Sequence, residues 1–342
     1  MNGGKSVGVT FEEIARMAGV SKATVSRVVN NAPNGVSEET RERVKQIVSE
    51  LNYGNAGLLA RTWWGSRTKS IGLIIPDIAN PFFAELAKEV SRAASDHGYA
   101  LLLGNTDFSL KTECKFVNAF TAKRVSGIIL ISVSASAHKE HGVMEKYEMP
   151  CLLLDRFVDG LAHAAAVLSD NAYATSSCCE LLINNGSRNI ALISGNMNVS
   201  TSRERMEGYQ DVLNHYQIPF SKDLVKYGDY TLEGGYNATL ELERCGTQYD
   251  AVLASNDMMA LGAINALREL SYRIPQDIQV IGFDNIVFAK CVEPALTTVQ
   301  QPTIEMGRKA VELLLDAIQN GWSDSKSPVR LQPKLLRRKT TR

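Results

Sequence analysis

Residues 18–30 read "AGVSKATVSRVVN", and this stretch decides how the first part of the chain folds. Gly19 ends a preceding helix, and Ser21 can cap the helix that follows. The valines of this second helix recur at i, i+3 and i+4, so they are expected to face inward. Two short helices joined by a glycine-containing turn are typical of a helix-turn-helix.

The flanking residues carry start signals for two further helices. Thr10 and Glu13 have the spacing of a capping box, which predicts the first helix. A third helix is predicted from Ser37, where two glutamates stand at the positive end of the helix and Val44 faces inward. We therefore predict an all-α helix-turn-helix domain over residues 1–52.

The outward face of the second helix carries small and polar residues that suit the major groove of DNA. Arg27 or Lys22 can read guanine through its O6 and N7 atoms, and Ala23 can pack against a thymine methyl group. Thr24 and Asn30 are better placed for phosphate. An ordinary three-helix domain with a solvated charged face is the alternative. The residues of this domain expected at DNA are Thr10, Ser21, Lys22, Ala23, Thr24, Ser26, Arg27 and Asn30.

The strings of this region resemble a known family. "AGVSKATVSRVVN", then "VSEETRERV" and then "LNY" are similar, almost position by position, to the DNA-binding head of the LacI/GalR family of bacterial transcription regulators. One departure is Glu13, where the family usually has Asp with the same charge. The resemblance implies that the head reads operator DNA.

From Ile71 onward, short β-branched runs alternate with amphipathic helical stretches. This alternation predicts parallel βαβ units. Some ten strands are too many for one comfortable doubly wound sheet, so we predict an α/β core of two lobes, with crossings near 165–171 and 293–302. The predicted division of the core, residues 71–342, is a first lobe of about 71–168 and 300–328 and a second lobe of about 169–299 and 329–342.

The core also resembles the same family. The phrases "IPDIANPFFAEL", "SNDMMALGAINAL", "VIGFDN" and "PALTTVQQP" are similar to its core, which is like a periplasmic sugar-binding protein. Ligands of such folds sit beyond the carboxyl ends of the strands, here between the lobes. The resemblance implies a small-molecule effector, and a homodimer on a roughly palindromic operator.

Residues that follow the predicted strands are the candidates for effector contact. They combine carboxylates, amides and an arginine with aromatic faces, which is the chemistry that sugars require. The resemblance implies that Arg205 and Asp284 contact the effector, that Tyr230 lies flat against it, and that Phe82 or Phe83 is a further contact. The full set is Asp77, Asn80, Phe82, Phe83, Asp155, Thr201, Arg205, Tyr230, Asn256 and Asp284.

Several of these residues also have a purely structural interpretation. Arg205 could pair with Glu204 or Glu207 on its own helix, where exposed pairs contribute little. Phe83 could belong to the core, because one of two adjacent aromatics on a helix usually points inward. Asn256 could simply cap the helix that starts at the next residue.

The connector, residues 53–70, contains the pair Trp63-Trp64. In the resembling proteins it forms a hinge helix whose leucine wedges into the minor groove, and "ARTW" matches that pattern with Trp63 at the wedge position. Such wedges unstack a base step at a cost of a few kcal/mol. Because the segment has two extra glycines and one extra residue, Leu59 is the alternative wedge. The DNA-contacting residues expected here are Leu59, Arg61 and Trp63.

Charge, cysteine placement and the N-terminal pattern narrow the class of protein and its compartment. The net charge is zero, although residues 1–69 carry ten Lys or Arg against six Glu. The six cysteines form no CxxC pair, and most lie in apolar runs, which favours small buried side chains in a reducing cytoplasm. No signal-peptide pattern is present, which argues against a transport-type binding protein.

No catalytic motif or histidine ligand cluster is present either, so we expect no enzymatic activity, metal or cofactor. The predicted protein is a cytoplasmic, homodimeric DNA-binding repressor. We expect it to repress a carbohydrate-utilisation operon under the control of a small sugar-like effector bound between the lobes, with a nucleoside or purine, or a sugar acid, as the alternative effector. The sequence does not specify whether the effector releases DNA or promotes binding.

Overall fold

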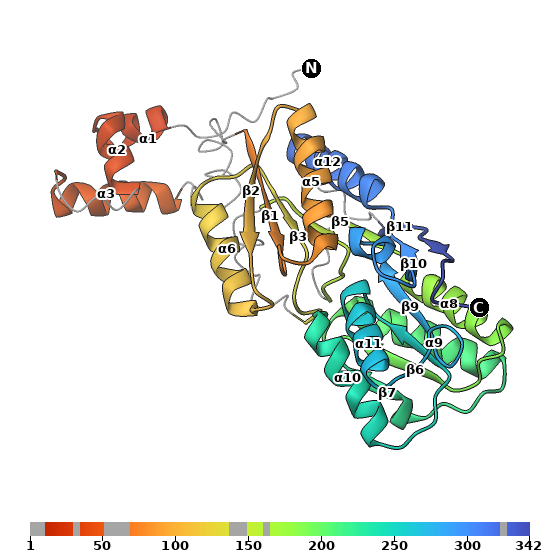
Figure 1. The fold of residues 1–342 in the computed structure, drawn as a ribbon. Helices are drawn as coiled ribbons and strands as arrows, with labels where there is room; N and C mark the ends of the chain where they lie inside the picture. Colours follow the sequence, from red (N-terminus) through yellow and green to blue (C-terminus); the bar gives the residue numbers. More distant parts are fainter. Residues whose placement is uncertain (1–10, 30–34, 51–68, 137–148, 160–164, 322–326) are drawn as a thin grey trace. The chain divides into compact units, whose positions relative to one another are not determined.

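The computed structural model describes residues 11–29, 35–50, 69–136, 149–159, 165–321 and 327–342. These residues form two compact units, which divide between Thr68 and Lys69. The first unit is the helical head and the second is the α/β core (Figure 1). Most of the predicted connector lies outside the described residues.

The head consists of helices α1 (Phe11–Ala18), α2 (Lys22–Val29) and α3 (Glu38–Glu50). Ile14, Val25 and Val44, one from each helix, are fully buried against one another. The Oγ atom of Ser21 accepts a hydrogen bond from the backbone N–H of Thr24 at 3.1 Å, so it caps α2 as the sequence predicts. The helix-turn-helix is therefore confirmed.

The first lobe of the core is built on a sheet whose described strands all pair in parallel. Helices α5 (Pro81–Asp96) and α12 (Thr303–Asn320) share a hydrophobic cluster with one face of this sheet (Figure 1). Helix α6 (Leu110–Ala122) packs on the opposite face, where the ring of Phe120 fills the space above Gly72. Across the sheet the strands follow the order β11 (Val329–Leu331), β5 (Ala165–Ser169), β4 (Cys151–Leu154), β3 (Ile128–Leu130), β1 (Ser70–Ile75) and β2 (Ala100–Asn105).

The second lobe repeats this plan. Helices α8 (Asn171–Asn184) and α9 (Ser200–His215) cover one face of its sheet, and α10 (Leu232–Arg244) and α11 (Asp257–Glu269) cover the other (Figure 1). Only β12 runs antiparallel among the described strands. The strand order is β12 (Lys334–Leu336), β10 (Thr297–Gln300), β9 (Gln279–Asp284), β8 (Ala251–Ala254), β6 (Ile190–Ser194) and β7 (Val225–Tyr227), and the 3₁₀ turns are η2 (Lys222–Leu224) and η3 (Val287–Lys290).

The chain crosses between the lobes where the sequence predicts. Strand β5 belongs to the first sheet, and α8, which starts two residues later, packs on the second. Strand β10 belongs to the second sheet, and the following α12 packs on the first. A third crossing joins β11 to β12. The assignment of all of residues 329–342 to the second lobe is therefore wrong, because β11 pairs with β5 and extends the first sheet.

The six cysteines differ in burial, and Cys114 is half-buried. Cys151, Cys178 and Cys179 are buried, as predicted, and burial raises the pKa of the Cys151 thiol to about 12. Cys245 and Cys291 are exposed, contrary to the general expectation of burial. No helix in the described ranges is both long and apolar enough to cross a membrane.

Candidate functional site

Helix α2 presents its polar face to solvent. Lys22, Ala23 and Arg27 are exposed, whereas Thr24 and Ser26 are half-buried. The Nζ atom of Lys22 lies 3.1 Å from the Oε1 atom of Glu12 on α1, and both side chains are largely exposed. An ion pair of this kind is weak, so Lys22 can exchange Glu12 for another acceptor at little cost. The remaining predicted DNA contacts, namely Thr10, Asn30, Leu59, Arg61 and Trp63, lie outside the described residues.

A second polar cluster gathers in the core around Arg205, which is 4% exposed. Its Nε atom donates to the Oδ1 atom of Asn171 at 2.9 Å, and its Nη1 atom donates to the backbone carbonyl of Ser255. The guanidinium group stands 3.7 Å from the centre of the Phe283 ring, a cation–π contact. Arg205 is therefore not held by a pair on its own helix, because Glu204 accepts hydrogen bonds from Asn171 and Arg330.

Asp284 joins this cluster to the two crossing segments. It ends strand β9 with a φ of 110°, and its Oδ1 atom accepts a hydrogen bond from the Nε2 atom of Gln301 at 2.8 Å. The Oε1 atom of Gln301 accepts in turn from the Oγ atom of Ser169 at 2.6 Å. Ser169 ends β5 and Gln301 follows β10, so the chain of hydrogen bonds lies where the sheets exchange strands. Open α/β folds bind ligands at such switch points.

The buried carboxyl groups of this cluster resist ionisation. Burial raises the pKa of Asp284 to about 7, although the Arg205 charge and the Gln301 hydrogen bond both act to lower it. Burial also raises the pKa of Asp155, against the attraction of Arg156 and Arg205. The pKa of Asp257 is raised well above its usual range by burial and then by the negative charge of Asp284.

Arg156, which sequence reasoning missed, bridges the aromatic residues of both lobes. It is 3% exposed, and its Nη1 atom donates to the carbonyl of Ser132 at 3.1 Å. Its guanidinium carbon lies 5.4 Å from the centre of the Phe83 ring and 5.6 Å from that of Tyr230. The available signal was its position directly after Asp155, at the end of the predicted strand "PCLLLD".

Three buried polar atoms beside these residues have no hydrogen-bond partner among the described residues. They are Oδ1 of Asp155, Nε of Arg156 and Oγ of Ser255. Buried donors and acceptors in folded proteins are nearly always satisfied. The three atoms are a carboxyl oxygen, a guanidinium N–H and a hydroxyl group, and the Arg156 Nε atom also lies 3.6 Å from the Oδ2 atom of Asp155.

Tyr230 is held rigidly at the edge of the cluster. It has a φ of 68°, and its hydroxyl oxygen lies 2.5 Å from the Oγ atom of Ser202 on α9. Its ring is nearly parallel to that of Phe108, with 6.4 Å between the ring centres. A Cβ atom at Gly195 would stand 2.1 Å from the tyrosine ring, so only glycine leaves room for this position.

The other predicted effector residues have mixed surroundings. Phe82 and Phe83 both belong to the core of the first lobe, and it is Phe83 that reaches Arg156. The amide oxygens of Asn80 and Asn256 cap α5 and α11, which favours the capping interpretation of Asn256. The remaining two are Asp77, whose Oδ1 atom accepts from the N–H of Ala79, and Thr201, which is buried in the first turn of α9.

The two units define a class of protein. A helix-turn-helix head precedes a two-lobed α/β core with a buried polar cluster at its switch point, which is the architecture of ligand-responsive transcription regulators. Residues 10–55 match the model for bacterial regulatory proteins of the lacI family, and residues 179–341 match the model for a periplasmic binding protein-like domain.

Similar proteins support the same assignment. The chain is 35% identical to the ribose operon repressor of Halalkalibacterium halodurans over 97% of both chains. It is 34% identical to the HTH-type transcriptional repressor PurR of Photorhabdus laumondii over 97% of this chain and 96% of the relative. A crystal structure of the lac repressor dimer bound to operator and the anti-inducer ONPF aligns with a TM-score of 0.72 and 30% identity, covering 98% of this chain and 99% of that one.

The chain therefore belongs to the lacI family of bacterial regulatory proteins. It is a DNA-binding transcriptional regulator and not an enzyme. The sequence-based predictions of the family, of the fold class and of this function are confirmed.

Proposed function

We propose that this protein represses its target genes from a roughly palindromic operator and that a neutral sugar bound in the Arg205–Asp284 cluster controls its affinity for DNA. The observation that carries the effector site is the set of unsatisfied atoms on Asp155, Arg156 and Ser255. Sugar hydroxyl groups donate and accept together, so a sugar can satisfy all three atoms.

The charges favour a neutral sugar over a sugar acid. The carboxyl groups of Asp155 and Asp284 share the cluster, and each has its pKa raised by burial. A ligand carboxylate would add a further buried negative charge beside them, which only Arg156 and Arg205 oppose. A ligand with hydroxyl groups instead donates to these carboxylates and favours their ionised form.

Similarity to the ribose operon repressor makes ribose the first sugar to test. The similarity to PurR, together with the rings of Phe83, Phe108 and Tyr230, keeps a nucleoside or purine as the second candidate. Aromatic faces stack on purines as well as on the C–H faces of sugars.

The test is a thermal-shift titration of the full-length protein with ribose, ribonate and adenosine, beside the variants Asp284→Ala and Asp277→Asn. A ligand at about a hundred times its dissociation constant adds about 2.7 kcal/mol of stability. We expect ribose to shift the wild type and Asp277→Asn, whose changed residue is half-buried on the second lobe and pairs with Arg273, but not Asp284→Ala. A sugar shift that survives in Asp284→Ala contradicts the assigned site, and a shift with adenosine alone favours the purine alternative.

For DNA we propose that α2 enters the major groove with Lys22, Ala23 and Arg27 toward the bases. These residues are exposed together on α2, while Val25 and Val28 of the same helix are buried in the head. The connector 53–70 then joins the head to the core, and Trp63 or Leu59 acts as the minor-groove wedge. We propose residues 1–52 as the DNA-binding domain and residues 71–342 as the effector and dimerisation core, in the cytoplasm.

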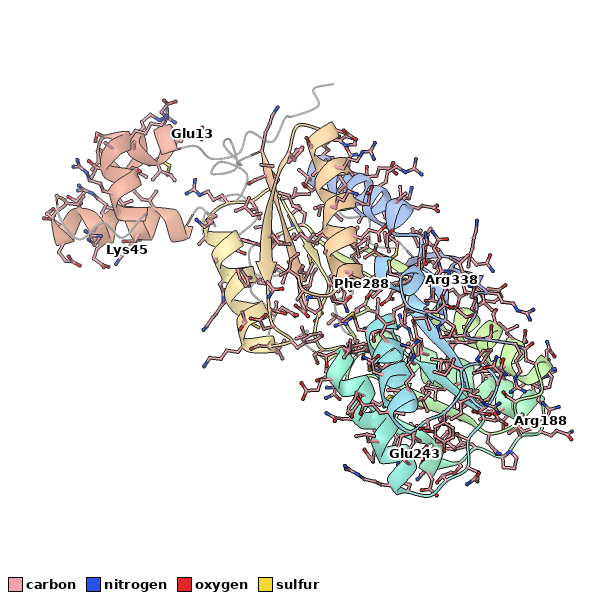
Figure 2. All side chains as sticks on the ribbon, in the orientation of Figure 1. Glu13, Lys45, Arg188, Glu243, Phe288 and Arg338 are labelled. Atoms are coloured by element: carbon pink, nitrogen blue, oxygen red, sulfur yellow. The ribbon has the colours of Figure 1, made fainter. Side chains whose placement is uncertain are left out.

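We propose that the regulator works as a homodimer, like the lac repressor in its operator complex. Several large apolar side chains of the core face solvent, among them Val287 at 63%, Phe288 at 49% and Ile304 at 67% exposure. Figure 2 labels Phe288. A second copy of the chain would bury them. Sedimentation analysis of Phe288→Glu checks the assignment: we expect a shift from dimer to monomer, and an unchanged dimer removes Phe288 from the interface.

A further inference from the structure

An ion pair joins the two lobes of the core where strand β11 meets helix α9. Arg330 lies in β11, which extends the first sheet, and Glu204 lies in α9, which covers the second. Both terminal nitrogens of Arg330 donate to the Oε1 atom of Glu204 at 3.0 Å. The two side chains are 49% and 21% exposed, and an ion pair this accessible adds little stability by itself. What sets this pair apart is the second oxygen of Glu204.

The second oxygen of Glu204 leads into the polar cluster. Its Oε2 atom accepts a hydrogen bond from the Nδ2 atom of Asn171 at 2.8 Å, and Asn171 is fully buried. On its other side, the Oδ1 atom of Asn171 accepts from the Nε atom of Arg205 at 2.9 Å. A continuous chain of side chains therefore runs from the surface of the first lobe to the arginine of the cluster. We call Arg330, Glu204, Asn171 and Arg205 the Glu204 relay.

The carboxylate of Glu204 fixes the orientation of Asn171. A side-chain amide has a donor on one side and an acceptor of nearly the same shape on the other, so its neighbours decide which way it faces. An ionised carboxylate only accepts, so it holds the amide nitrogen of Asn171 and turns the amide oxygen toward Arg205. The backbone carbonyl of Ser169 acts in the same sense at the longer distance of 3.2 Å. Without the carboxylate, the acceptor that holds Arg205 is less firmly oriented.

The charge of Glu204 acts on the same cluster. Burial raises the pKa of Asp155, Arg156 and Arg205 oppose this rise, and the negative charge of Glu204 adds to it. A change at Glu204 therefore affects both a carboxyl group and an arginine of the cluster.

We propose that Glu204 is a positioning residue for Arg205 and that Arg330 makes this positioning depend on how the lobes are arranged. This role rests on the proposed function, because it takes Arg205 as a contact of the effector. Arg330 and Glu204 belong to different lobes, so a movement that parts β11 from α9 removes both Arg330 donors from Oε1. The carboxylate then holds Asn171 less firmly, and the change reaches Arg205. Such coupling is reciprocal, so an effector held by Arg205 favours the arrangement in which the relay is complete.

The first experiment needs no effector. The Nε–H groups of arginine are observed by proton–nitrogen correlation spectroscopy of the full-length protein, and Arg205→Lys identifies the Arg205 signal by its loss. Glu204→Met removes the acceptor, Glu204→Gln keeps one, and Arg330→Gln weakens the pair between the lobes. Glu207→Met is the matched control, because Glu207 is an exposed glutamate on the same helix. The melting temperature of each variant checks that it is folded.

We expect the Arg205 Nε–H group to exchange with water about fivefold faster in Glu204→Met than in the wild type, with a smaller increase in Glu204→Gln. Glu207→Met should exchange at the wild-type rate. Equal rates in Glu204→Met and the wild type would overturn the proposal. An equally large increase in Glu207→Met would overturn it as well, because the effect would then belong to the helix rather than to the relay.

The second experiment measures ribose affinity by titration calorimetry. Glu204→Met should bind ribose about tenfold more weakly and Arg330→Gln about threefold more weakly, whereas Glu207→Met should match the wild type. A wild type that binds no ribose refutes the proposed effector but not the relay, which the exchange rates test on their own. Wild-type ribose affinity in Glu204→Met contradicts the link between the relay and the effector.

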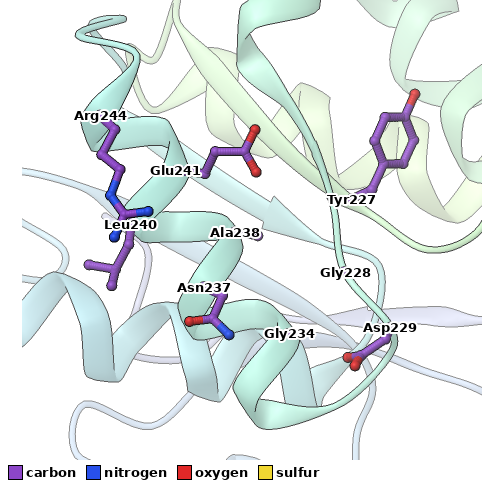
Figure 3. A pocket seen from close by; sticks show the side chains of 9 residues that line it. All are labelled: Tyr227, Gly228, Asp229, Gly234, Asn237, Ala238, Leu240, Glu241 and Arg244. Atoms are coloured by element: carbon purple, nitrogen blue, oxygen red, sulfur yellow. The ribbon is translucent and has the colours of Figure 1, made fainter.

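A further control concerns a separate groove of the second lobe, of about 580 Å³, where strand β7 ends beside α10 (Figure 3). Its lining includes Asp229, Asn237 and Arg244 but no member of the Glu204 relay. Because polar side chains of this kind also bind sugars, Arg244→Gln tests whether ribose binds there. We expect an unchanged ribose affinity in Arg244→Gln. A loss of affinity in this variant with none in Glu204→Met would overturn the proposal.

Discussion

Replacing Asp284 by Asn should change how the stability of the core depends on pH. The folded-state pKa of Asp284 is about 7, because burial of the carboxyl group outweighs the attraction of Arg205. The unfolded chain ionises this group near 3.8. Between these values the unfolded state releases the proton and the folded state keeps it, so stability falls as the pH rises and the loss is complete above pH 7.

The size of the effect follows from the two pKa values. A difference of about three corresponds to about 4 kcal/mol, since each pKa unit is worth about 1.4 kcal/mol. Roughly 3 kcal/mol of this lies between pH 5 and pH 8. An asparagine at 284 does not titrate, and its side-chain oxygen can still accept the hydrogen bond from Gln301. The wild type should therefore lose roughly 3 kcal/mol more than Asp284→Asn over that interval.

The assay is urea unfolding of the full-length protein without effector, followed by circular dichroism at pH 5 and pH 8. The matched control is Asp277→Asn. Asp277 pairs with Arg273 at 2.6 Å, and that pairing lowers its pKa to about 2. The stability that this ion pair contributes is fully present above the ordinary pKa of Asp277 and is lost only as the pH falls through 2. Between pH 5 and pH 8 the stability of Asp277→Asn should therefore depend on pH in the same way as that of the wild type. Parallel pH profiles for Asp284→Asn and the wild type would refute the assigned burial of this charge.

Three further predictions concern the head, the packing and the effector site. Arg27→Ala should weaken specific operator binding at least tenfold in an anisotropy titration while non-specific, salt-sensitive binding persists, and equal operator affinity would remove Arg27 from base reading. Gly262→Ala should lower the free energy of unfolding by about 1–3 kcal/mol, because its Cβ would stand 2.0 Å from the backbone oxygen of Leu232 and force α10 away from α11; an unchanged urea midpoint counts against this packing. Arg156→Met should abolish the ribose response in the thermal-shift assay and leave operator affinity within about twofold, whereas a full response shows that Arg156 is not a ligand contact.

The fold was largely predictable because hydrophobic periodicity reports local structure. Runs such as "IGLIIPD" and "IQVIGFDN" became buried parallel strands, and the crossing segments 165–171 and 293–302 were found as well. Strand β11 was misplaced for a physical reason. It has three residues, and its side chains are half-buried or exposed, so no apolar pattern indicates which sheet it joins.

The site was predictable only in part. Position after a strand selected Arg205, Tyr230 and Asp284 as candidates, because strand ends are visible in the sequence, and the family resemblance implied their contacts with an effector. The roles of Ser169 and Gln301 depend on how two distant crossing segments meet in space, which local patterns do not encode.

Arg156 and Asn256 also show that local sequence patterns do not reveal which distant residues a side chain will contact. Arg156 was overlooked although its neighbour Asp155 was selected, because a buried arginine between two aromatic rings has no local signature. Conversely, Asn256 was selected, although its amide oxygen caps α11 and its amide nitrogen donates to the carbonyl of Tyr230.

We propose that this regulator recognises one operator through α2 and that a ligand in the polar cluster lowers or raises its affinity for that operator. The most direct measurement is selection of DNA sites from a random duplex library by the full-length protein, followed by titration of the enriched duplex with and without ribose. We expect a roughly palindromic site that the protein binds at least about a thousandfold more tightly than random DNA. Ribose should change this affinity in the wild type and have no effect in Asp284→Ala. Failure to enrich any sequence, or equal affinity for enriched and random duplexes, would contradict it.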